Sequence, residues 1–339
     1  MARYIIRRLL QSIPLLFIIS FVLFALMQAT GDPLATMGGR QPTRAADRER
    51  LSRQLGLDQP ITTQYLYWLI GNDWVVIDPE TGRTGPRRGV LRGDFGTSYV
   101  SRQPVLEMIG GRIPDTLLLT GTAEVLILAV SLAVGIFSAV RKYSLFDQLF
   151  TAISFVLYSV PVFIMAYSLI YLLSIGLRRA GLPYFPTSGI FDPAIGRTFE
   201  QVVWHMVLPV LTLSLISIAG YSRYIRSTML EVINSDYIRT ARSKGITERR
   251  TLFVHAFKNA ALPLITLVGL DLPFLLGGAV VTETIFAWPG MGYLFINSLT
   301  RSDYPVLMGI LMLIAVGVVL AQLLVDVLYT VLDPRIRYS

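Results

Sequence analysis

The sequence predicts an all-α polytopic membrane protein with six transmembrane helices and a structured extracytoplasmic insertion after the first of them. Two composition values argue against a soluble domain: 53% of the 339 residues are hydrophobic and only 15% are charged, whereas a typical soluble protein has about 25% charged residues. So few charges would not keep a compact protein of this size in solution. The third observation is that the apolar residues gather in long uninterrupted segments.

Six segments are long enough to cross the roughly 30 Å hydrocarbon core of a bilayer as helices. They cover residues 9–29, 116–140, 149–176, 202–220, 260–282 and 305–331. The first follows three arginines, as a secretory signal does, but its apolar run exceeds the about 7–15 residues of such signals. We therefore expect the first segment to be retained as a membrane span.

The distribution of Lys and Arg over the loops predicts the orientation. With the N-terminus in the cytoplasm, the cytoplasmic segments hold 15 of these residues and the two short external loops hold four. Cytoplasmic loops carry the excess of positive charge in membrane proteins. Both termini are therefore expected in the cytoplasm.

The long segment 30–113 is predicted to fold rather than to serve as a linker. Residues 46–56 predict a short charged helix that ends at Gly56, and residues 62–70 predict an aromatic-rich helix after Pro60. Asp-Pro, Thr-Gly and Gly-Pro pairs within 71–93 predict turns and a hairpin. The expected division is the N-terminal end with the first helix at 1–29, the insertion at 30–113 and a five-helix core at 114–339.

Several kinds of catalytic and metal site are not expected in this chain. It has no cysteine, and its three lysines are followed by tyrosine, glycine and asparagine. None of them stands in the Gly-Lys-Ser/Thr sequence that binds nucleotide phosphates. The two histidines, His205 and His255, are too few for a His-rich metal site and too far apart in sequence to suggest a catalytic triad. We therefore expect no enzyme activity, no cofactor and no metal in this chain.

Three acidic residues, Glu124, Asp271 and Asp326, fall inside predicted spans. Acidic groups at membrane depth face the bundle interior or an aqueous cavity, and a relay of them would indicate a proton-coupled transporter. Asp271 is a candidate pathway residue because the nearby Pro273 frees backbone carbonyls and can bend the helix. Further polar candidates on the third span are Ser154, Tyr158 and Ser159, although such residues also form interhelical hydrogen bonds.

The cytoplasmic loop 221–259 predicts a short helix near residues 235–245. Asn234 or Ser235 can cap its start, and Gly245 can end it. The i, i+3, i+4 spacing places one set of residues on a common face: Tyr237, Ile238, Ala241 and Arg242. Such a helix, attached to two spans, would act as a lever for a partner that binds it. A solvated loop that carries positive charge explains the same composition.

This loop resembles the signature loop of binding-protein-dependent ABC importer permeases, a glycine-centred motif of the form E-A-A-x-x-x-G-x(9)-I-x-L-P. The matching positions are Ala241, Gly245 and Leu262-Pro263, and the fuller strings DYIRTARSKG and HAFKNAALPLIT are similar to the dipeptide, oligopeptide and nickel branch. Other similar blocks follow in order: GDP at 31–33, LGLDQPITTQYLYWL at 55–69, GDFGTSYVSRQPVLEMIGGRIPDTLLL at 93–119, LLGGAVVTETIFAWPGMGYLFINSLTRSDYP at 275–305 and LLVDVLYTVLDPRIR at 323–337. The chain resembles the first ("B"-type) permease subunit of this family.

The resemblance implies a type I importer fold in the inner membrane of a prokaryote. It implies a heterodimer with a second homologous permease, an extracytoplasmic solute-binding protein, and two cytoplasmic ABC ATPase subunits that hold the ATP and Mg. The residues it implies for contact with the ATPases are Tyr237, Arg239, Ala241, Arg242 and Gly245. Two features depart from the family: an insertion at 72–91, and Asp271 and Pro273 where Gln and Gly are expected.

Several functions remain open from the sequence. Di- or oligopeptides are the expected substrates, and the lack of histidine and cysteine suited to bare metal favours them over nickel. A nickel-chelate, haem or oligosaccharide permease of the same family is an alternative. A proton-coupled secondary transporter that uses Glu124 and Asp271 is an alternative from another class. A structural membrane anchor explains neither the buried acids nor the cytoplasmic helix.

Overall fold

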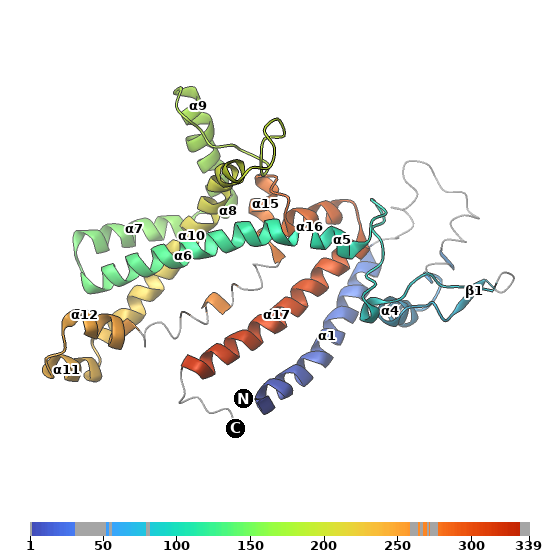
Figure 1. Cartoon of the computed structure of the whole chain (residues 1–339), viewed down its shortest axis with the longest axis horizontal. Helices are drawn as coiled ribbons and strands as arrows, with labels where there is room; N and C mark the ends of the chain where they lie inside the picture. The colour runs from blue at the N-terminus through green and yellow to red at the C-terminus, as the bar shows by residue number, and fades with distance from the viewer. Residues whose placement is uncertain are drawn as a thin grey trace. The chain divides into compact units, whose positions relative to one another are not determined.

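The computed structural model describes residues 2–30, 52–53, 56–78, 82–257, 264, 267–269, 271 and 277–332. The chain folds as two compact units that are both mainly helical (Figure 1). We call residues 115–293 with those from 320 onward the core unit. Residues 2–114 with 294–319 form the N-terminal unit.

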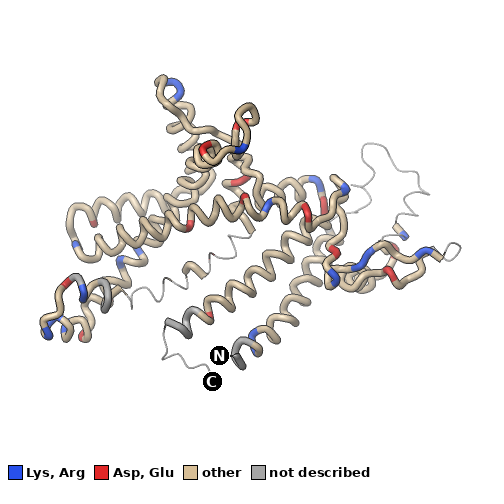
Figure 2. The backbone as a smooth tube through the Cα atoms, viewed as in Figure 1, with Lys and Arg blue, Asp and Glu red and all other residues tan. Residues whose placement is uncertain are grey.

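Among the described residues, five helical segments are long and apolar enough to cross a membrane. They are Ile6–Ala29, Val105–Val140, Val162–Arg179, Phe199–Ile233 and Tyr304–Val327. Charged residues are sparse along them (Figure 2). The helices that contain these segments include α1 (Ala2–Thr30), α6 (Ile113–Val140), α10 (Phe199–Ile233) and α17 (Tyr304–Leu332). About half of the predicted span 260–282 lies outside the described residues.

The predicted third span, 149–176, differs from the structure because it is not one helix. Helix α7 (Leu145–Ser159) ends before Pro161, and α8 (Val162–Leu169) begins after it, continuing through the π-helix η2 (Ile170–Gly176) and α9 (Leu177–Arg179). Proline lacks an N–H and disfavours the helical conformation at the residue before it. Val160 is accordingly extended, so the apolar stretch that is long enough to cross a membrane starts at Val162.

The predicted fourth span is longer than expected. The sequence predicts a span over 202–220, whereas α10 continues to Ile233, so the first third of the predicted loop 221–259 is helix. The α10 helix is capped by Thr198, whose hydroxyl accepts the N–H of Gln201 at 3.3 Å. It packs against α7 and α8. A helix that extends beyond the apolar run provides a rigid connection between the buried bundle and the short helices that follow.

The core unit is held by an apolar cluster between α6, α10 and the loops at one end of the bundle. Its buried members are Leu119, Ala123, Ile127, Ile190, Val202, Met206, Val210, Ile218 and Trp288. Close approach of α6 and α10 requires Gly135, because a Cβ there would lie 2.8 Å from the Ile225 side chain and from the Ser222 carbonyl oxygen. Small residues commonly allow such approach between membrane helices. The remaining short helices of the core unit are α11 (Asp236–Ser243), α12 (Glu248–Arg250), the π-helix η3 (Thr251–Ala256) and α15 (Val280–Ile285). Helix α16 (Met291–Thr300) begins in the core unit and belongs to the N-terminal unit from Leu294.

In the N-terminal unit, α1 packs against α4 (Ile61–Ile70), which confirms the predicted aromatic helix. The rings of Phe24, Tyr65 and Trp68 pack together, and the hydroxyls of Ser20 and Tyr65 share a hydrogen bond of 2.7 Å. The predicted hairpin is also present, with β1 (Val76–Asp78) antiparallel to β2 (Arg83–Thr84). The 3-10 helix η1 (Val90–Arg92) and α5 (Val105–Gly110) complete the unit. Most of the predicted helix 46–56 lies outside the described residues.

Candidate coupling helix and pathway residues

Helix α11 starts where the sequence predicts, but without the predicted side-chain cap. The backbone carbonyl of Ser235 accepts the N–H groups of Ile238 and Arg239, both at 3.2 Å. The Ser235 hydroxyl donates instead to the Val232 carbonyl at 2.6 Å, and the Asn234 amide donates to the Leu230 carbonyl at 2.8 Å. Both polar side chains therefore bind the end of α10, which fixes the corner between the two helices.

Gly245 ends the helix as predicted. Its φ of 74° is in the left-handed region, where glycine has no steric penalty. Its N–H donates to the Arg242 carbonyl at 2.9 Å, and the N–H of Ile246 donates to the Ala241 carbonyl at 3.3 Å. These bonds satisfy carbonyls at the helix end that have no partner within the helix. Nothing lies within 4 Å of where a Cβ on Gly245 would be, so only its backbone conformation restricts this position.

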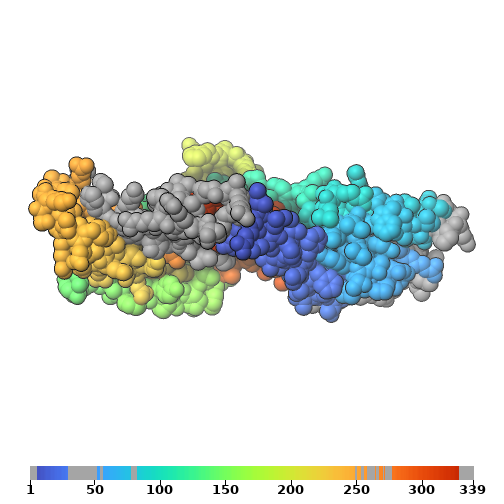
Figure 3. Space-filling model, turned by 90° about the horizontal axis from the view of Figure 1, so that it is seen from below, coloured from blue at the N-terminus to red at the C-terminus, as the bar shows by residue number. Residues whose placement is uncertain are grey.

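The predicted common face of α11 is divided in the structure. Ile238 and Ala241 are buried, and Ile238 belongs to an apolar cluster with residues of α10 and η3, among them Met229 and Ala256. Tyr237 and Arg242 are exposed. Arg239 and Gly245 are exposed as well. In Figure 3 the orange surface of this region stands beside the yellow surface of α10 and is open to solvent.

An ion pair joins α11 to α12. The guanidinium of Arg242 donates from Nη2 and Nε to the two carboxylate oxygens of Glu248, at 2.7 and 3.1 Å. This bond lowers the pKa of Glu248, so the carboxylate stays charged at neutral pH. Arg239 and Asp236 lie 3.6 Å apart and are both highly exposed. The charged residues of this region are visible in Figure 2.

A second ion pair joins α10 to the start of α7. Arg226 donates from Nε and Nη2 to the carboxylate of Asp147, at 2.5 and 2.8 Å. The backbone N–H of Tyr143 donates to the same carboxylate at 2.8 Å, and together these bonds hold the pKa of Asp147 below its usual value. This ion pair is not among the features predicted from the sequence. The sequence feature that could have indicated it is the S-x-x-D pattern at Ser144, which is typical of a helix start. Ser144 caps α7, and its hydroxyl accepts the N–H of Asp147.

The predicted pathway residues on α7 do not form one group. Ser154 is fully buried, and its hydroxyl has no hydrogen-bond partner among the described residues. The Ser159 hydroxyl donates to the Val156 carbonyl at 2.8 Å. Tyr158 is exposed, and the guanidinium of Arg223 lies 6.0 Å from its ring centroid and 4.0 Å from that of Phe155. Ser154 and Tyr158 therefore differ in burial, although their i, i+4 spacing puts them on the same side of α7.

Asp271 is hydrogen-bonded to α10, since its carboxylate accepts the hydroxyl of Tyr221. One carboxylate oxygen of Glu124 is buried without a partner among the residues that the structure describes. Asp326 accepts a hydrogen bond of 3.3 Å from Gln322 on its own helix. Within the described parts of the chain, no group of three or more His, Cys, Asp or Glu side chains is arranged to hold a metal ion.

Glu283, which is not among the predicted site residues, is fully buried in the core unit. Its carboxylate accepts the Thr116 hydroxyl at 3.1 Å and the N–H groups of Ala279 and Tyr293 at 3.2 and 3.0 Å. The turn between α15 and α16 is bound to the same threonine, because the N–H of Met291 donates to Thr116 Oγ1 at 2.7 Å. The sequence feature that could have indicated Glu283 is its position, as an acidic residue shortly before the PGMG turn.

Comparisons with known proteins cover the whole chain. Residues 131–338 match the family described as "Binding-protein-dependent transport system inner membrane component", and residues 1–120 match the corresponding N-terminal family. The chain is 42% identical to the oligopeptide transport system permease protein AppB of Bacillus subtilis and 38% identical to the dipeptide transport system permease protein DppB of Escherichia coli K12. It is 35% identical to the glutathione transport system permease protein GsiC of Escherichia coli O1:K1. Each alignment covers 100% of both proteins.

Proposed function

Because this chain belongs to the family of binding-protein-dependent transport system inner membrane components, we propose that it is the permease subunit of an ATP-driven peptide importer. It is a multi-pass inner-membrane protein and a transport component. Relatives along its full length are named for oligopeptides, dipeptides and glutathione. These names support peptides as the cargo and lend no support to nickel, haem or proton-coupled transport.

In this proposal the chain forms half of the translocation pathway, with both termini in the cytoplasm. A second homologous permease supplies the other half, and an external solute-binding protein delivers the peptide. Two cytoplasmic ABC ATPases bind the ATP and Mg, since no lysine of this chain stands in a phosphate-binding loop.

The observation that carries the proposal is that α11 is exposed on one side and bound to α10 on the other. Tyr237, Arg239, Arg242 and Gly245 form the surface proposed to contact an ATPase. Ala241 is buried, so its proposed part is to seat the helix rather than to touch the partner.

Movement of α11 would reach the membrane helices through two connections. Ile238 packs against α10, and Arg226 of α10 is paired with Asp147 at the start of α7. Packed helices move as rigid bodies, so a push on α11 would shift α10 and α7 together. Asp271 is bonded to Tyr221 of α10, which supports its proposed place in the pathway; Ser154, Tyr158 and Ser159 of α7 are proposed to line it as well.

Substitution of Gly245 tests this coupling, and Gly181 provides a matched control. The two glycines have φ values of 74° and 71°, and neither has an atom within 4 Å of its Cβ position. Gly245→Val and Gly181→Val therefore introduce the same backbone strain at different ends of the core unit. The assay is peptide uptake and vanadate-sensitive ATP hydrolysis by the assembled transporter in liposomes.

We expect Gly245→Val to abolish peptide-stimulated ATP hydrolysis and uptake, and Gly181→Val to retain both. Uptake by Gly245→Val at the wild-type rate would contradict the coupling role of α11. Solute accumulation by this chain alone, sensitive to an uncoupler and indifferent to vanadate, would instead indicate a secondary transporter.

A further inference from the structure

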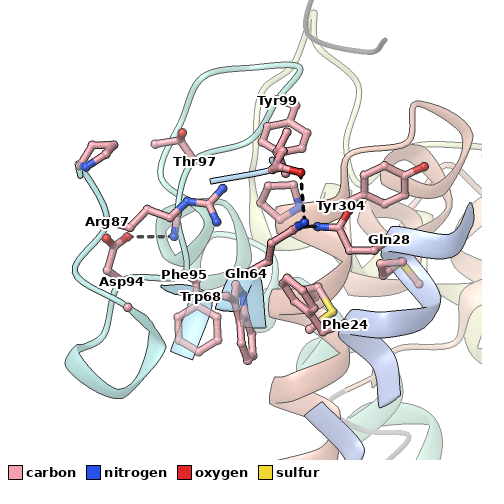
Figure 4. Close-up of a pocket in the computed structure, with 17 residues that line it drawn as sticks. Phe24, Gln28, Gln64, Trp68, Arg87, Asp94, Phe95, Thr97, Tyr99 and Tyr304 are labelled. Atoms are coloured by element: carbon pink, nitrogen blue, oxygen red, sulfur yellow. Dashed lines mark hydrogen bonds between the residues drawn. The ribbon is translucent and has the colours of Figure 1, made fainter. Parts of the chain in front are cut away.

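The N-terminal unit contains a cavity of about 250 Å³ between α1, α4, residues 86–99 and the start of α17 (Figure 4). Much of its wall is aromatic and comes from four parts of the unit: Phe24, Trp68, Phe95, Tyr99 and Tyr304. In the orientation proposed above, this cavity lies at the extracytoplasmic end of α1 and α17. An amphipathic cavity of this kind is the usual form of a small-ligand site.

Arg87 supplies a positive charge to this cavity. Its backbone is fixed by the fully buried Asn72, which accepts the Arg87 N–H on Oδ1 at 3.0 Å and donates its own N–H to the Arg87 carbonyl at 2.9 Å. Figure 4 shows the guanidinium extending from the loop toward the other lining residues. Among the described residues, no hydrogen bond or ion pair of this guanidinium is found. The backbone of Arg87 is thus fixed, and its guanidinium is available to bind a ligand.

Asp94 and Gln64, which also line the cavity, already have hydrogen-bond partners within the protein. The carboxylate of Asp94 accepts the N–H groups of Arg88 and Gly96 at 2.8 and 2.9 Å. The Gln64 amide donates to two backbone carbonyls and accepts the Gln28 amide at 2.8 Å. Since the Asp94 carboxylate binds N–H groups of its own loop, Arg87 is the charged side chain that a ligand can bind in this cavity. The cavity is therefore suited to a ligand with a negatively charged group and an apolar remainder.

We propose that this cavity binds the C-terminal end of a peptide, with the peptide carboxylate on Arg87 and the last side chain against the aromatic wall. The inference rests on the proposed function, which makes peptides the cargo. Guanidinium and carboxylate groups form strong paired hydrogen bonds. The cavity is smaller than the about 300–1,000 Å³ of typical small-molecule sites, so it takes the last one or two residues of a peptide rather than a whole oligopeptide.

A pair of photoreactive tripeptides tests the site. Both are Ala-Ala-(4-benzoylphenylalanine); one has a free carboxylate and the other a C-terminal amide. They are irradiated with the assembled transporter in nanodiscs of phosphatidylcholine, and the labelled residues are located by mass spectrometry. We expect the acid to label the cavity wall and the amide to bind about 10- to 100-fold more weakly, the range for a hydrogen bond to a charged group.

Arg87→Gln should weaken binding of the acid by the same factor and leave binding of the amide unchanged. The matched control is Arg83→Gln, since Arg83 is an exposed arginine of the hairpin just before Arg87 and does not line the cavity. Equal affinity of Arg87→Gln and wild type for the acid would overturn the proposal. So would labelling that phosphatidylglycerol suppresses and unlabelled Ala-Ala-Phe does not, because the site would then belong to a lipid headgroup.

Uptake measured on the same samples separates this inference from the proposed function. If the wild-type transporter imports the peptide with ATP but the acid and the amide label it equally, the cavity assignment fails and the transport function stands. If the acid labels the cavity specifically but no ATP-dependent import occurs with any peptide, the binding site stands and the proposed function fails.

Discussion

The hydroxyl of Thr116 donates a hydrogen bond of 3.1 Å to the carboxylate of Glu283, which lies 167 residues further along the chain. Next to this bond, the indole N–H of Trp288 donates to the Asp115 carbonyl at 2.8 Å. These contacts attach the turn that follows α15 to the first residues of α6. Glu283 is therefore the centre of a buried connection between segments that are distant in sequence.

Glu283→Gln should destabilise the chain by about 1–3 kcal/mol, because the carboxylate accepts from three donors and an amide nitrogen would face at least one of them. The measurement is the thermal unfolding midpoint of the purified chain in detergent. Glu200→Gln is the control, since Glu200 is exposed in the first turn of α10. Equal midpoints for Glu283→Gln and wild type would show that the carboxylate is not needed for the connection.

Gly290→Ala should prevent correct folding of the same region. A Cβ at Gly290 would lie 2.4 Å from Glu283 Oε2 and 2.5 Å from Thr116 Oγ1, much closer than atoms in a packed interior approach. The control is Gly121→Ala in α6, where no atom lies within 4 Å and alanine favours the helix. Size-exclusion profiles of the solubilised variants should show a monodisperse peak for Gly121→Ala and loss of it for Gly290→Ala.

The long helices were predictable because an apolar run in a helix has only one stable arrangement in a bilayer. Their ends were less predictable, since local chemistry sets them. Pro161 breaks the predicted third span into two helices. The α10 helix continues to Ile233 because Met229 and Ile225 remain in an apolar cluster beyond the predicted membrane boundary. Hydropathy alone does not report packing outside the membrane.

The position of α11 and its end at Gly245 were also predictable, although the side-chain cap predicted at its start is absent. The orientation of α11 was not predictable. A spacing of i, i+3, i+4 defines a stripe and does not say which residues on it meet the protein. The structure buries Ile238 and Ala241 and leaves Tyr237 exposed. Glu283 escaped prediction for a related reason, since its partner Thr116 is brought near only by the fold.

Asp147→Asn should lower stability in a way that depends on pH. Asp147 is buried and paired with the partly exposed Arg226, so we expect a loss of about 2–3 kcal/mol, below that of fully buried pairs. The pKa of Asp147 is lowered from 3.8 in the folded chain, so the pair contributes fully above this value and is lost as the pH falls through the lower folded pKa.

The difference in unfolding midpoint between wild type and Asp147→Asn should therefore stay constant from pH 7 to pH 5 and shrink below about pH 4. Asp236→Asn is the control. Asp236 is almost fully exposed and lies 3.6 Å from Arg239, and an exposed pair of this kind contributes little to stability. A difference that persists unchanged at pH 3 would mean that the side chain acts through its shape and not through its charge.

A charge exchange between Arg242 and Glu248 separates two functions that Arg242 can have. If Arg242 acts by joining α11 to α12, Arg242→Glu should reduce peptide-stimulated ATP hydrolysis, and the double variant with Glu248→Arg should restore it, because the exchanged pair can form the same bond. The pair is exposed, so its contribution to stability is about 0.2–1 kcal/mol and weakens with salt. If Arg242 instead binds an ATPase directly, the exchanged pair puts a carboxylate in the contact and hydrolysis stays low. Rescue that is present at low ionic strength and fades at high ionic strength would assign the effect to the bond between the two helices.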